Sequence, residues 1–380
     1  MKEQHKILFF ANNTSLITNL VLKITPYFSN CEVLVLHNSK MQPNFKQIDL
    51  PIKNIDVSCL TYKEIKNILK EWSPDICILN NFRGIIDQFF IRICRAEKIK
   101  VVFLAHGILT EDVLTFKTLK KKNLLLRLKR VGYQFKQYFS FIIHSTSPLN
   151  ELKILYTVLF KNYFSVNPFD LYMVYGERCF NILKEKYELK KGINTYLVGY
   201  PLFSSECQKQ KVLNSTHDNY NEGVLYVHQP FILDNYAQLS YEEEREFILK
   251  WANKLIPTYH SFTLLLHPRE NLERYKLLYE GTKVNVIQSP NDFRMFINRN
   301  LVLGHYSTAL LFSLYFNIPT YIIDYPSMSR SDLFKNIFPI ATLDDFDKEK
   351  QWNNITNNKK YILGEENTFE HISNLILSII

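Results

Sequence analysis

The chain has 380 residues, which at about 150 residues per domain favours two domains over one. Its apolar fraction of 46% and aromatic fraction of 14% supply large side chains for burial, so the composition excludes a globally disordered chain. The net charge of +9 is uneven, because residues 1–200 hold 29 Lys and Arg against 16 Asp and Glu, whereas residues 201–380 are net acidic. We therefore expect a basic partner surface in the first half.

Cysteine usage and hydropathy indicate a cytoplasmic protein. Six cysteines stand singly, without the CxxC spacing of a zinc site or the density of a disulfide scaffold, and predict buried thiols in a reducing compartment: Cys31, Cys59, Cys77, Cys94, Cys179 and Cys207. The first apolar run is too short for a signal peptide, and no window approaches 18 apolar residues. We expect neither secretion nor a transmembrane helix.

Short apolar runs alternate with helix-compatible stretches along the first half, which is typical of buried parallel strands. The predicted strands are Ile7–Ala11, Val33–Leu36, Ile76–Leu79, Val101–Leu104, Leu171–Val174 and Tyr196–Val198. The pattern restarts after a polar segment with Val224–Val227, Phe262–Leu266, Val284–Ile287, Leu301–Leu303 and Thr320–Ile323. Helices are predicted between these strands, among them 241–255 and 309–316.

The alternation predicts two α/β domains of the Rossmann type that face each other across a cleft. We place the first domain at 1–203, with an insertion at 113–165, and the second at 223–366. These two domains are joined by a linker at 204–222, in a polar segment, 204–223, that contains the run NSTHDNYNEG. An amphipathic helix at 367–380 completes the chain and is a candidate to cross back to the first domain.

One candidate site follows the strand at 262–266, where His267, Pro268 and Arg269 come next and Glu270 follows them. Proline ends the strand and holds both neighbouring side chains at the carboxyl edge of the sheet. Arginine can bind phosphate through two hydrogen bonds, and histidine can contact a leaving phosphate oxygen. The alternative is a solvated histidine beside a surface ion pair.

A second candidate is the sequence Gly304–His305–Tyr306–Ser307–Thr308, between a strand and an apolar helix. Backbone N–H groups at the start of a helix attract anions, and paired hydroxyls there can bind phosphate without lysine. The alternative is an ordinary helix cap. His305 either lines this phosphate site or packs beneath the helix.

A third candidate follows the strand at 101–104, where Ala105, His106 and Gly107 precede Glu111 and Asp112. His106 is a candidate general base, because an imidazole with an ordinary pKa near 6.5 abstracts protons near neutrality. Glu111 and Asp112 compete for that role, or serve only as first-turn carboxylates of a helix.

Taken in order, these motifs resemble those of the bacterial GT-B glycosyltransferase group. The segments that carry the resemblance are AHG at 105–107, GYP at 199–201, YVHQP at 226–230, HPR at 267–269 and GHYSTALLFS at 304–313. The group includes capsule polysaccharide transferases, sialyl- and polysialyltransferases, and CDP-glycerol polyol-phosphate transferases. The resemblance covers nearly the whole chain, although each motif is short.

This resemblance implies metal-independent transfer from a nucleotide-activated donor, with neither a metal ion nor another cofactor. His267 matches the histidine that contacts the donor phosphate or cytidine, and Ser307 and Thr308 match the phosphate-binding pair. The sialyl-type acid motif is incomplete here, since Val113 follows Asp112. His106–Gly107 matches the base motif of the polyol-phosphate transferases but lacks their preceding tryptophan, so the identity of the base stays open.

We therefore expect an inverting glycosyltransferase of bacterial capsule or lipooligosaccharide synthesis. Its donor would be a CMP-activated nonulosonic acid or Kdo, and its acceptor a hydroxyl of a glycan or glycolipid. Pro268, Arg269, Gly304, His305 and Gln229 complete the expected donor site. The alternatives are polyol-phosphate transfer from CDP-glycerol or CDP-ribitol and a catalytically silent scaffold of the same fold. A nucleotide-sugar 2-epimerase is less favoured, because its Arg-Pro-Glu-type segment is missing.

The segment 113–150 contains no acidic residue, and its basic side chains lie among leucines and aromatic residues. The basic residues are Lys117, Lys120, Lys121, Lys122, Arg127, Lys129, Arg130 and Lys136. This composition is typical of an interfacial helix on an anionic membrane, here the inner face of the cytoplasmic membrane. The alternative is packing on its own domain. Nucleic-acid binding is not expected, because no signature of such a fold accompanies the lysines.

Overall fold

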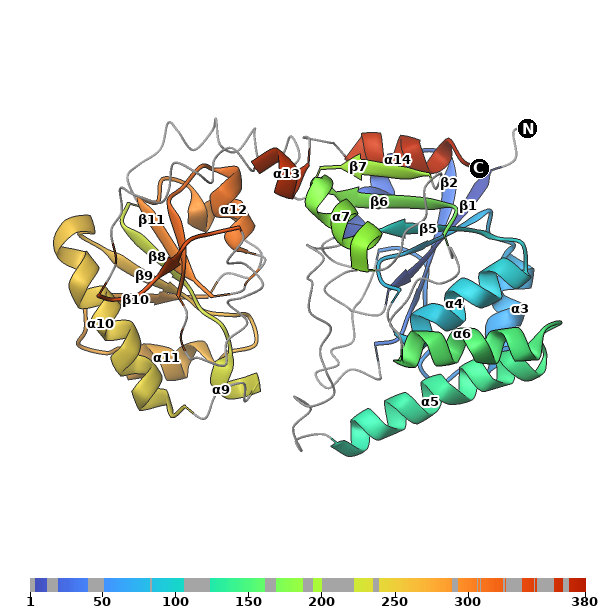
Figure 1. The fold of residues 1–380 in the computed structure, drawn as a ribbon, viewed down its shortest axis with the longest axis horizontal. Coiled ribbons are helices and arrows are strands. Elements are labelled where there is room, and N and C mark those ends of the chain that lie inside the picture. Colours follow the sequence, from blue (N-terminus) through green and yellow to red (C-terminus); the bar gives the residue numbers. More distant parts are fainter. Residues whose placement is uncertain are drawn as a thin grey trace. The chain divides into compact units, whose positions relative to one another are not determined.

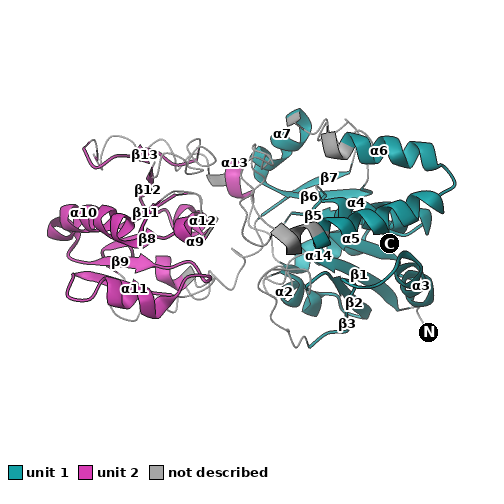
Figure 2. Ribbon diagram, turned by 90° about the horizontal axis from the view of Figure 1, so that it is seen from below, with its two compact units in different colours: residues 1–109, 120–201, 365–380 teal, residues 110–119, 202–364 magenta. Residues whose placement is uncertain are grey.

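The computed structural model describes residues 4–11, 20–39, 51–82, 84–105, 124–160, 169–186, 194–199, 222–234, 239–288, 293–305, 307, 309–323, 325, 337–344, 346, 359–364 and 369–380. These residues form two compact units (Figures 1 and 2). Unit 1 contains the described residues up to Gly199 together with 369–380, and unit 2 contains those from 222 to 364.

Unit 1 is built on a parallel sheet whose described strands follow the order β3-β2-β1-β4-β5-β6-β7. The strands are β1 (His5–Ala11), β2 (Cys31–His37), β3 (Asn54–Asp56), β4 (Ile76–Leu79), β5 (Lys100–Leu104), β6 (Leu171–Tyr175) and β7 (Thr195–Val198). The strand order reverses between β1 and β4, where Ile7 pairs with Ile76. All six strands predicted in this half are present. The added strand, β3, lies at the sheet edge.

The helices of unit 1 are α2 (Leu22–Ile24), α3 (Tyr62–Trp72), α4 (Ile85–Ala96), α5 (Leu124–Ile143), α6 (Pro148–Phe160), α7 (Gly176–Lys186) and α14 (Phe369–Leu377), with a 3-10 turn η2 (Thr25–Tyr27). A capping box starts α3, because the Thr61 side chain accepts from the Glu64 N–H while Glu64 accepts from the Thr61 N–H. Ile372 and Ile376 of α14 are fully buried in the core of unit 1. The final helix therefore belongs to the first unit.

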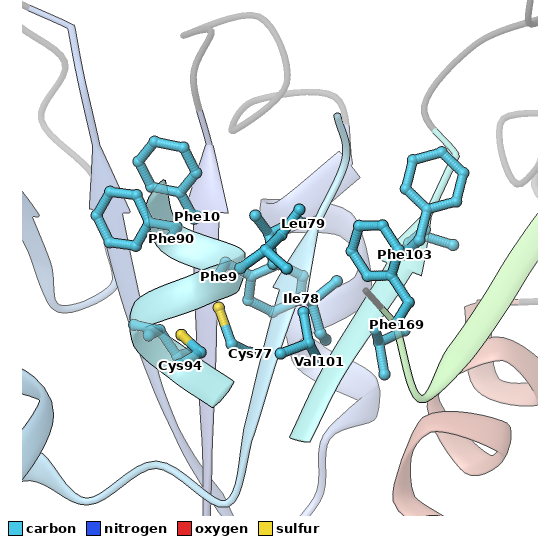
Figure 3. Close-up of a cluster of buried hydrophobic side chains, with 14 of the residues drawn as sticks. Phe9, Phe10, Cys77, Ile78, Leu79, Phe90, Cys94, Val101, Phe103 and Phe169 are labelled. Carbon is cyan, nitrogen blue, oxygen red and sulfur yellow. The ribbon is translucent and has the colours of Figure 1, made fainter. Parts of the chain in front are cut away.

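Aromatic side chains fill the core of unit 1 on the strands and on α4 (Figure 3). The rings of Phe10 and Phe90 stack with their centroids 3.8 Å apart, and those of Phe103 and Phe169 lie 5.4 Å apart. Cys77 is buried in this core, and burial raises the pKa of its thiol, which makes it unreactive.

The expectation of buried cysteines is wrong in part, because not every thiol lies on the apolar face of a strand or helix. Cys77, Cys94 and Cys179 are buried. Cys59 is exposed in the loop before α3, and Cys31 is partly exposed where β2 begins. Cys207 lies outside the described residues.

Unit 2 repeats the design with a second parallel sheet, whose described strands follow the order β10-β9-β8-β11-β12-β13. The strands are β8 (Val224–Val227), β9 (Phe262–Leu265), β10 (Val284–Ile287), β11 (Leu301–Gly304), β12 (Thr320–Ile323) and β13 (Ile340–Ala341). The sequence predicts all of these except β13. Their order reverses between β8 and β11, which pair directly, so this sheet also has a topological switch point.

The helices of unit 2 are α9 (Phe231–Asp234), α10 (Tyr241–Tyr259), α11 (Leu272–Leu278), α12 (Leu310–Tyr315) and α13 (Lys359–Leu363), with a 3-10 turn η5 (Phe293–Phe296). Ser240 caps α10 in a second capping box with Glu243. Trp251 and Tyr275 are fully buried and anchor α10 and α11 to the core. Across the described parts of both units, no helix is long and apolar enough to span a membrane.

Candidate functional site

Three histidines follow three neighbouring strands of the unit 2 sheet. His228 comes directly after β8, His267 lies two residues beyond the end of β9, and His305 comes directly after β11. Since the strands are parallel, these residues share the carboxyl edge of the sheet, and β8 and β11 flank its switch point. Ligands of open α/β sheets bind at such a position. Two of the predicted donor-site residues, His267 and His305, therefore lie at this edge, together with His228.

The His-Pro-Arg segment forms a tight turn after β9. The N–H of Glu270 donates to the carbonyl of His267 over 2.9 Å. The side-chain amide of Gln288 donates to the carbonyl of His267 over 3.0 Å and to that of Glu270 over 2.9 Å. The N–H of Arg269 donates to His267 Nδ1 over 3.2 Å, so a neutral ring carries its proton on Nε2. His267 is partly exposed, and Pro268 and Arg269 are exposed. The turn presents both side chains at the sheet edge.

His305 is fully buried, and both of its ring nitrogens are hydrogen-bonded within unit 2. Nδ1 lies 3.0 Å from the carbonyl of Ile323, and Nε2 lies 2.7 Å from the hydroxyl of Tyr226. Because a carbonyl only accepts, Nδ1 carries the proton and Nε2 accepts from Tyr226. Burial, together with the neighbouring His228, lowers the pKa of His305 to about 3. Of the two interpretations, this geometry favours packing over a contact with donor phosphate.

The predicted cap before α12 differs from the expectation. The helix begins at Leu310 and has six residues, so it is shorter than predicted. Ser307 lies three residues ahead, and its hydroxyl accepts from the Ala309 N–H over 3.2 Å. Gly304 has a packing role, because a Cβ there would lie 2.7 Å from Cδ2 of Leu310. Thr308 lies outside the described residues.

Gln229 is buried beside His228, where the chain turns from β8 into α9. The turn is closed by the N–H of Phe231, which donates to the Gln229 carbonyl over 2.8 Å. The side chain thus lies at the sheet edge where the sequence places it. Its predicted contact with the donor stays a prediction.

A polar cluster that the sequence does not reveal lies behind His228. Its Nε2 is 3.1 Å from Oε1 of Glu244 on α10, and the hydroxyl of Tyr275 on α11 donates to Oε2 of Glu244 over 2.7 Å. The side chains of His228 and Glu244 are 1% and 4% exposed. The available sequence signal was the histidine at a strand end in YVHQP, but nothing local connects it to Glu244 or Tyr275.

In unit 1, the proposed general bases lie beyond the described end of β5. His106, Glu111 and Asp112 are outside the described residues, as is Gly107. The preceding Ala105 is buried, and its carbonyl accepts from the Tyr175 hydroxyl. The backbone that leads to His106 is thus held at the carboxyl edge of the first sheet.

The basic segment is divided between core and surface. Tyr138 and Phe141 of α5 are buried in the core of unit 1, so this side of the helix packs on its own domain. They lie on the side of α5 that packs on α3 and α4, where the ring of Phe141 contacts those of Tyr62 and Phe89. The basic residues 117–122 lie outside the described part, and the side chains of Arg127 and Arg130 are likewise not described.

The outer side of α5 and α6 exposes large apolar side chains, and we call this surface the hairpin face. It comprises Val131, Phe139, Ile143, Leu149, Leu152 and Tyr156, with Lys129, Lys136 and Lys153 exposed among them. Leu149 is 83% exposed and Ile143 71%. Glu151, the acidic residue of these two helices, is buried and paired with Arg92 of α4 over 2.8 Å. The face is therefore apolar and positively charged.

No group of three or more His, Cys, Asp or Glu side chains that could hold a metal ion occurs among the described residues. The donor groups at the unit 2 edge are imidazole, guanidinium and hydroxyl groups. Such groups match the oxygens of a phosphate.

Comparison with known proteins gives a match in structure only. No protein-family model matches the chain, and no curated protein matches it in sequence. Among solved structures, the UDP-GlcNAc 2-epimerase of Methanocaldococcus jannaschii has a TM-score of 0.54 at 13% identity, covering 99% of this chain and 100% of the epimerase. The wall teichoic acid polymerase TagF has a TM-score of 0.56 at 11% identity, covering 99% of this chain and 89% of the polymerase.

The chain has a GT-B fold. Both neighbours align over nearly its whole length, and both share the two parallel α/β units described above. At these identities the likeness concerns the fold alone. It agrees with the fold that the strand-end motifs predict.

Proposed function

We propose that the chain is a glycosyl- or polyol-phosphate transferase that uses a cytidine-nucleotide-activated donor. The observation that supports this proposal is the carboxyl edge of the unit 2 sheet, where His228, His267 and Arg269 lie at the ends of β8 and β9. These groups are suited to phosphate oxygens, and they lie beside the switch point at which nucleotides bind in open α/β sheets.

Two donors fit this edge. A CMP-activated nonulosonic acid or Kdo was favoured by the sequence motifs, whereas TagF has been solved with CDPG, which supports CDP-glycerol or CDP-ribitol. The proposed product is a bacterial capsule polysaccharide or lipooligosaccharide in the first case and a polyol-phosphate chain in the second. Phosphate analysis of the product separates them, since only the second transfer adds phosphate to the acceptor.

In the sugar-transfer reaction, the acceptor hydroxyl oxygen attacks the anomeric carbon while the bond from that carbon to the CMP phosphate oxygen breaks. A single displacement inverts the configuration. His106 accepts the hydroxyl proton, or Glu111 or Asp112 does so in its place. His267, through its Nε2–H, and Arg269 stabilise the charge that develops on the departing phosphate, so no divalent ion is required.

A second candidate is epimerisation of a nucleotide sugar, because the epimerase from M. jannaschii matches over its full length and was solved with UDP-GlcNAc and UDP. This activity predicts a preference for uridine nucleotides. A catalytically silent scaffold predicts no nucleotide binding at all.

Calorimetric titration with CMP, CDP, UMP, UDP and GDP, each with and without Mg²⁺, tests the proposal. We expect a cytidine nucleotide to bind best and the metal to make no difference. His267→Ala should abolish turnover with little change in the melting temperature, because the side chain is partly exposed. A uridine preference would support the epimerase, and a lack of response to every nucleotide would contradict both enzymes.

The hairpin face supports a second part of the proposal, contact with an anionic membrane that carries the acceptor. Exposed apolar side chains enter the interfacial region, and each nearby lysine contributes about 1 kcal/mol on an anionic surface. We propose that the protein works on the inner face of the cytoplasmic membrane.

Sedimentation with vesicles of phosphatidylcholine, with and without phosphatidylserine, tests this contact. The wild type should sediment with the anionic vesicles at low salt, and Ile143→Glu with Leu149→Glu should abolish this. The matched control is Leu277→Glu, which changes a leucine that is 72% exposed on α11 of unit 2. Equal sedimentation of all three proteins would refute a role for the hairpin face.

A further inference from the structure

The cluster of His228, Glu244 and Tyr275 favours a proton on one nitrogen of an imidazole. The carboxylate of Glu244 only accepts, and it receives the Tyr275 hydroxyl on Oε2. Its Oε1 lies 3.1 Å from His228 Nε2 without forming a hydrogen bond of good geometry, and the negative charge beside Nε2 favours a proton on that nitrogen. The second nitrogen, Nδ1, is buried and has no hydrogen-bond partner in the described part of the chain. Buried polar atoms are nearly always paired, so this exception requires a physical reason.

The position of His228 supplies a reason. Its N–H donates to the carbonyl of Leu265 over 2.9 Å, which continues the β8–β9 ladder to the carboxyl edge of the sheet. The neighbouring strand at the switch point, β11, ends in His305, both of whose nitrogens are occupied. The unpartnered Nδ1 therefore belongs to the one histidine at the switch point that still has a nitrogen available to a ligand.

We propose that His228 contacts the phosphate of the bound nucleotide through Nδ1, and that Glu244 and Tyr275 are the positioning residues that orient its ring. The inference rests on the proposed function and adds these three residues to the donor site. With Nε2–H held by Glu244, a proton on Nδ1 gives a charged ring whose Nδ1–H donates to a phosphate oxygen. The carboxylate stabilises this charged form, as the aspartate of a catalytic triad stabilises its imidazolium.

The groups that surround the ring are known from the structure. Titratable groups approach the cluster from each packed element: Glu244 and Tyr241 from α10, Tyr275 from α11, Glu270 from the turn after β9, Tyr226 from β8 and His305 from the end of β11. Burial raises the pKa of Tyr275, with Glu244 and Glu270 adding to the effect, so its hydroxyl keeps the proton that it donates. His305 stays neutral, because its pKa is lowered to about 3.

A pair of amide variants separates ligand contact from structural support. In His228→Asn, the amide nitrogen takes the place of Nδ1 and can still donate to phosphate, but the contact with Glu244 is lost. In His228→Gln, the amide takes the place of Nε2 and keeps the contact with Glu244, but nothing replaces Nδ1. If Nδ1 binds phosphate, His228→Asn retains a higher nucleotide affinity than His228→Gln. If His228 only supports the fold, His228→Gln lowers the melting temperature and the affinity less than His228→Asn does.

The probes are CMP and CDP, with cytidine as the phosphate-free reference, titrated calorimetrically. We expect His228→Gln to weaken CMP and CDP binding about tenfold to hundredfold, the range for a hydrogen bond to a charged group, and to leave cytidine binding unchanged. Tyr275→Phe should weaken nucleotide binding more mildly in the same phosphate-dependent way. Its matched control is Tyr279→Phe, because Tyr279 is buried near Glu244 but its hydroxyl has no partner in the described residues.

A spectroscopic measurement tests the orientation without any ligand. In ¹⁵N-labelled wild-type protein the ring of His228 should show a proton on Nε2, and Glu244→Gln should remove this fixed preference, because an amide can donate as well as accept. The inference is overturned if the wild type binds CMP or CDP better than cytidine and all variants bind these nucleotides as tightly as the wild type does. It is also overturned if the variants lose affinity for the nucleotides and for cytidine alike and their melting temperature falls as well. A wild type with no preference for CMP or CDP over cytidine overturns the proposed function, and the inference with it.

Discussion

Lowering the pH tests the hydrogen bonds of His305 directly. The ring is fully buried, donates to the Ile323 carbonyl and accepts from Tyr226, and its pKa is lowered from 6.5 to about 3 by burial and by the neighbouring His228. Between these two values the unfolded chain binds a proton at this position and the folded chain does not. The contribution of His305 to the free energy of unfolding is therefore fully present above pH 6.5 and is lost as the pH falls towards 3.

The size of the effect follows from the two pKa values. At pH 5 the unfolded-state histidine is almost fully protonated, 1.5 units below its pKa of 6.5, while the folded ring remains neutral. Since one unit corresponds to about 1.4 kcal/mol, His305 should lower the free energy of unfolding by about 2 kcal/mol between pH 7.5 and pH 5.

Urea denaturation followed by tryptophan fluorescence measures this loss at the two pH values. Carboxylates also contribute, so the informative quantity is the difference between the wild type and His305→Phe. The variant should be less stable at pH 7.5, because Tyr226 and Ile323 lose their partner, but it should lose about 2 kcal/mol less than the wild type on acidification to pH 5. Equal losses, or NMR signals of the His305 ring that titrate near pH 6.5, would refute the argument.

Three further substitutions probe the stability of the two units. Glu151→Gln leaves the guanidinium of Arg92 without its buried partner and should cost about 3 kcal/mol, measured as a lower urea midpoint. Gly304→Ala should cost about 1–3 kcal/mol in the wild type and much less in a Leu310→Ala background, because the added Cβ lies 2.7 Å from Cδ2 of Leu310; a double-mutant cycle measures the difference. Ser240→Ala removes the cap of α10 and should lower the stability by about 1 kcal/mol, whereas Ser240→Asp should be tolerated.

The sequence predicts the strands well where burial produces a continuous apolar run. The strands β4, β8 and β12 have the predicted bounds, because each is buried on both faces and ends where polar residues begin. The edge strand β10 also has the predicted bounds, although its Asn285 is exposed. The missed strands are β3, which is only half-buried, and β13, which has two residues. Both lie at the edge of their sheet, where pairing with a single neighbour imposes no apolar pattern.

The candidate site is predictable only as far as its residues follow strands. Parallel strands bring their carboxyl ends to one edge, so Gln229, His267 and His305 could be placed together from the sequence. The partners that decide their chemistry come from elsewhere: Glu244 lies on a helix 16 positions after His228, and Tyr275 lies 47 positions after it. These contacts depend on how the helices pack on the sheet, and no local pattern in the sequence predicts them.

Hydrogen-bond accounting then separates the three histidines, which look equivalent in the sequence. His305 uses both nitrogens inside the fold, whereas His267 accepts at Nδ1 and His228 is bound at Nε2. The phosphate contacts that we propose therefore come from the residues after β8 and β9, whereas the histidine after β11 supports the fold. We expect saturating CDP to shift the ring signals of His228 and His267 in ¹⁵N spectra, while His305 keeps its proton on Nδ1. A CDP-induced change of the His305 tautomer would show instead that the phosphate reaches the β11 side of the switch point.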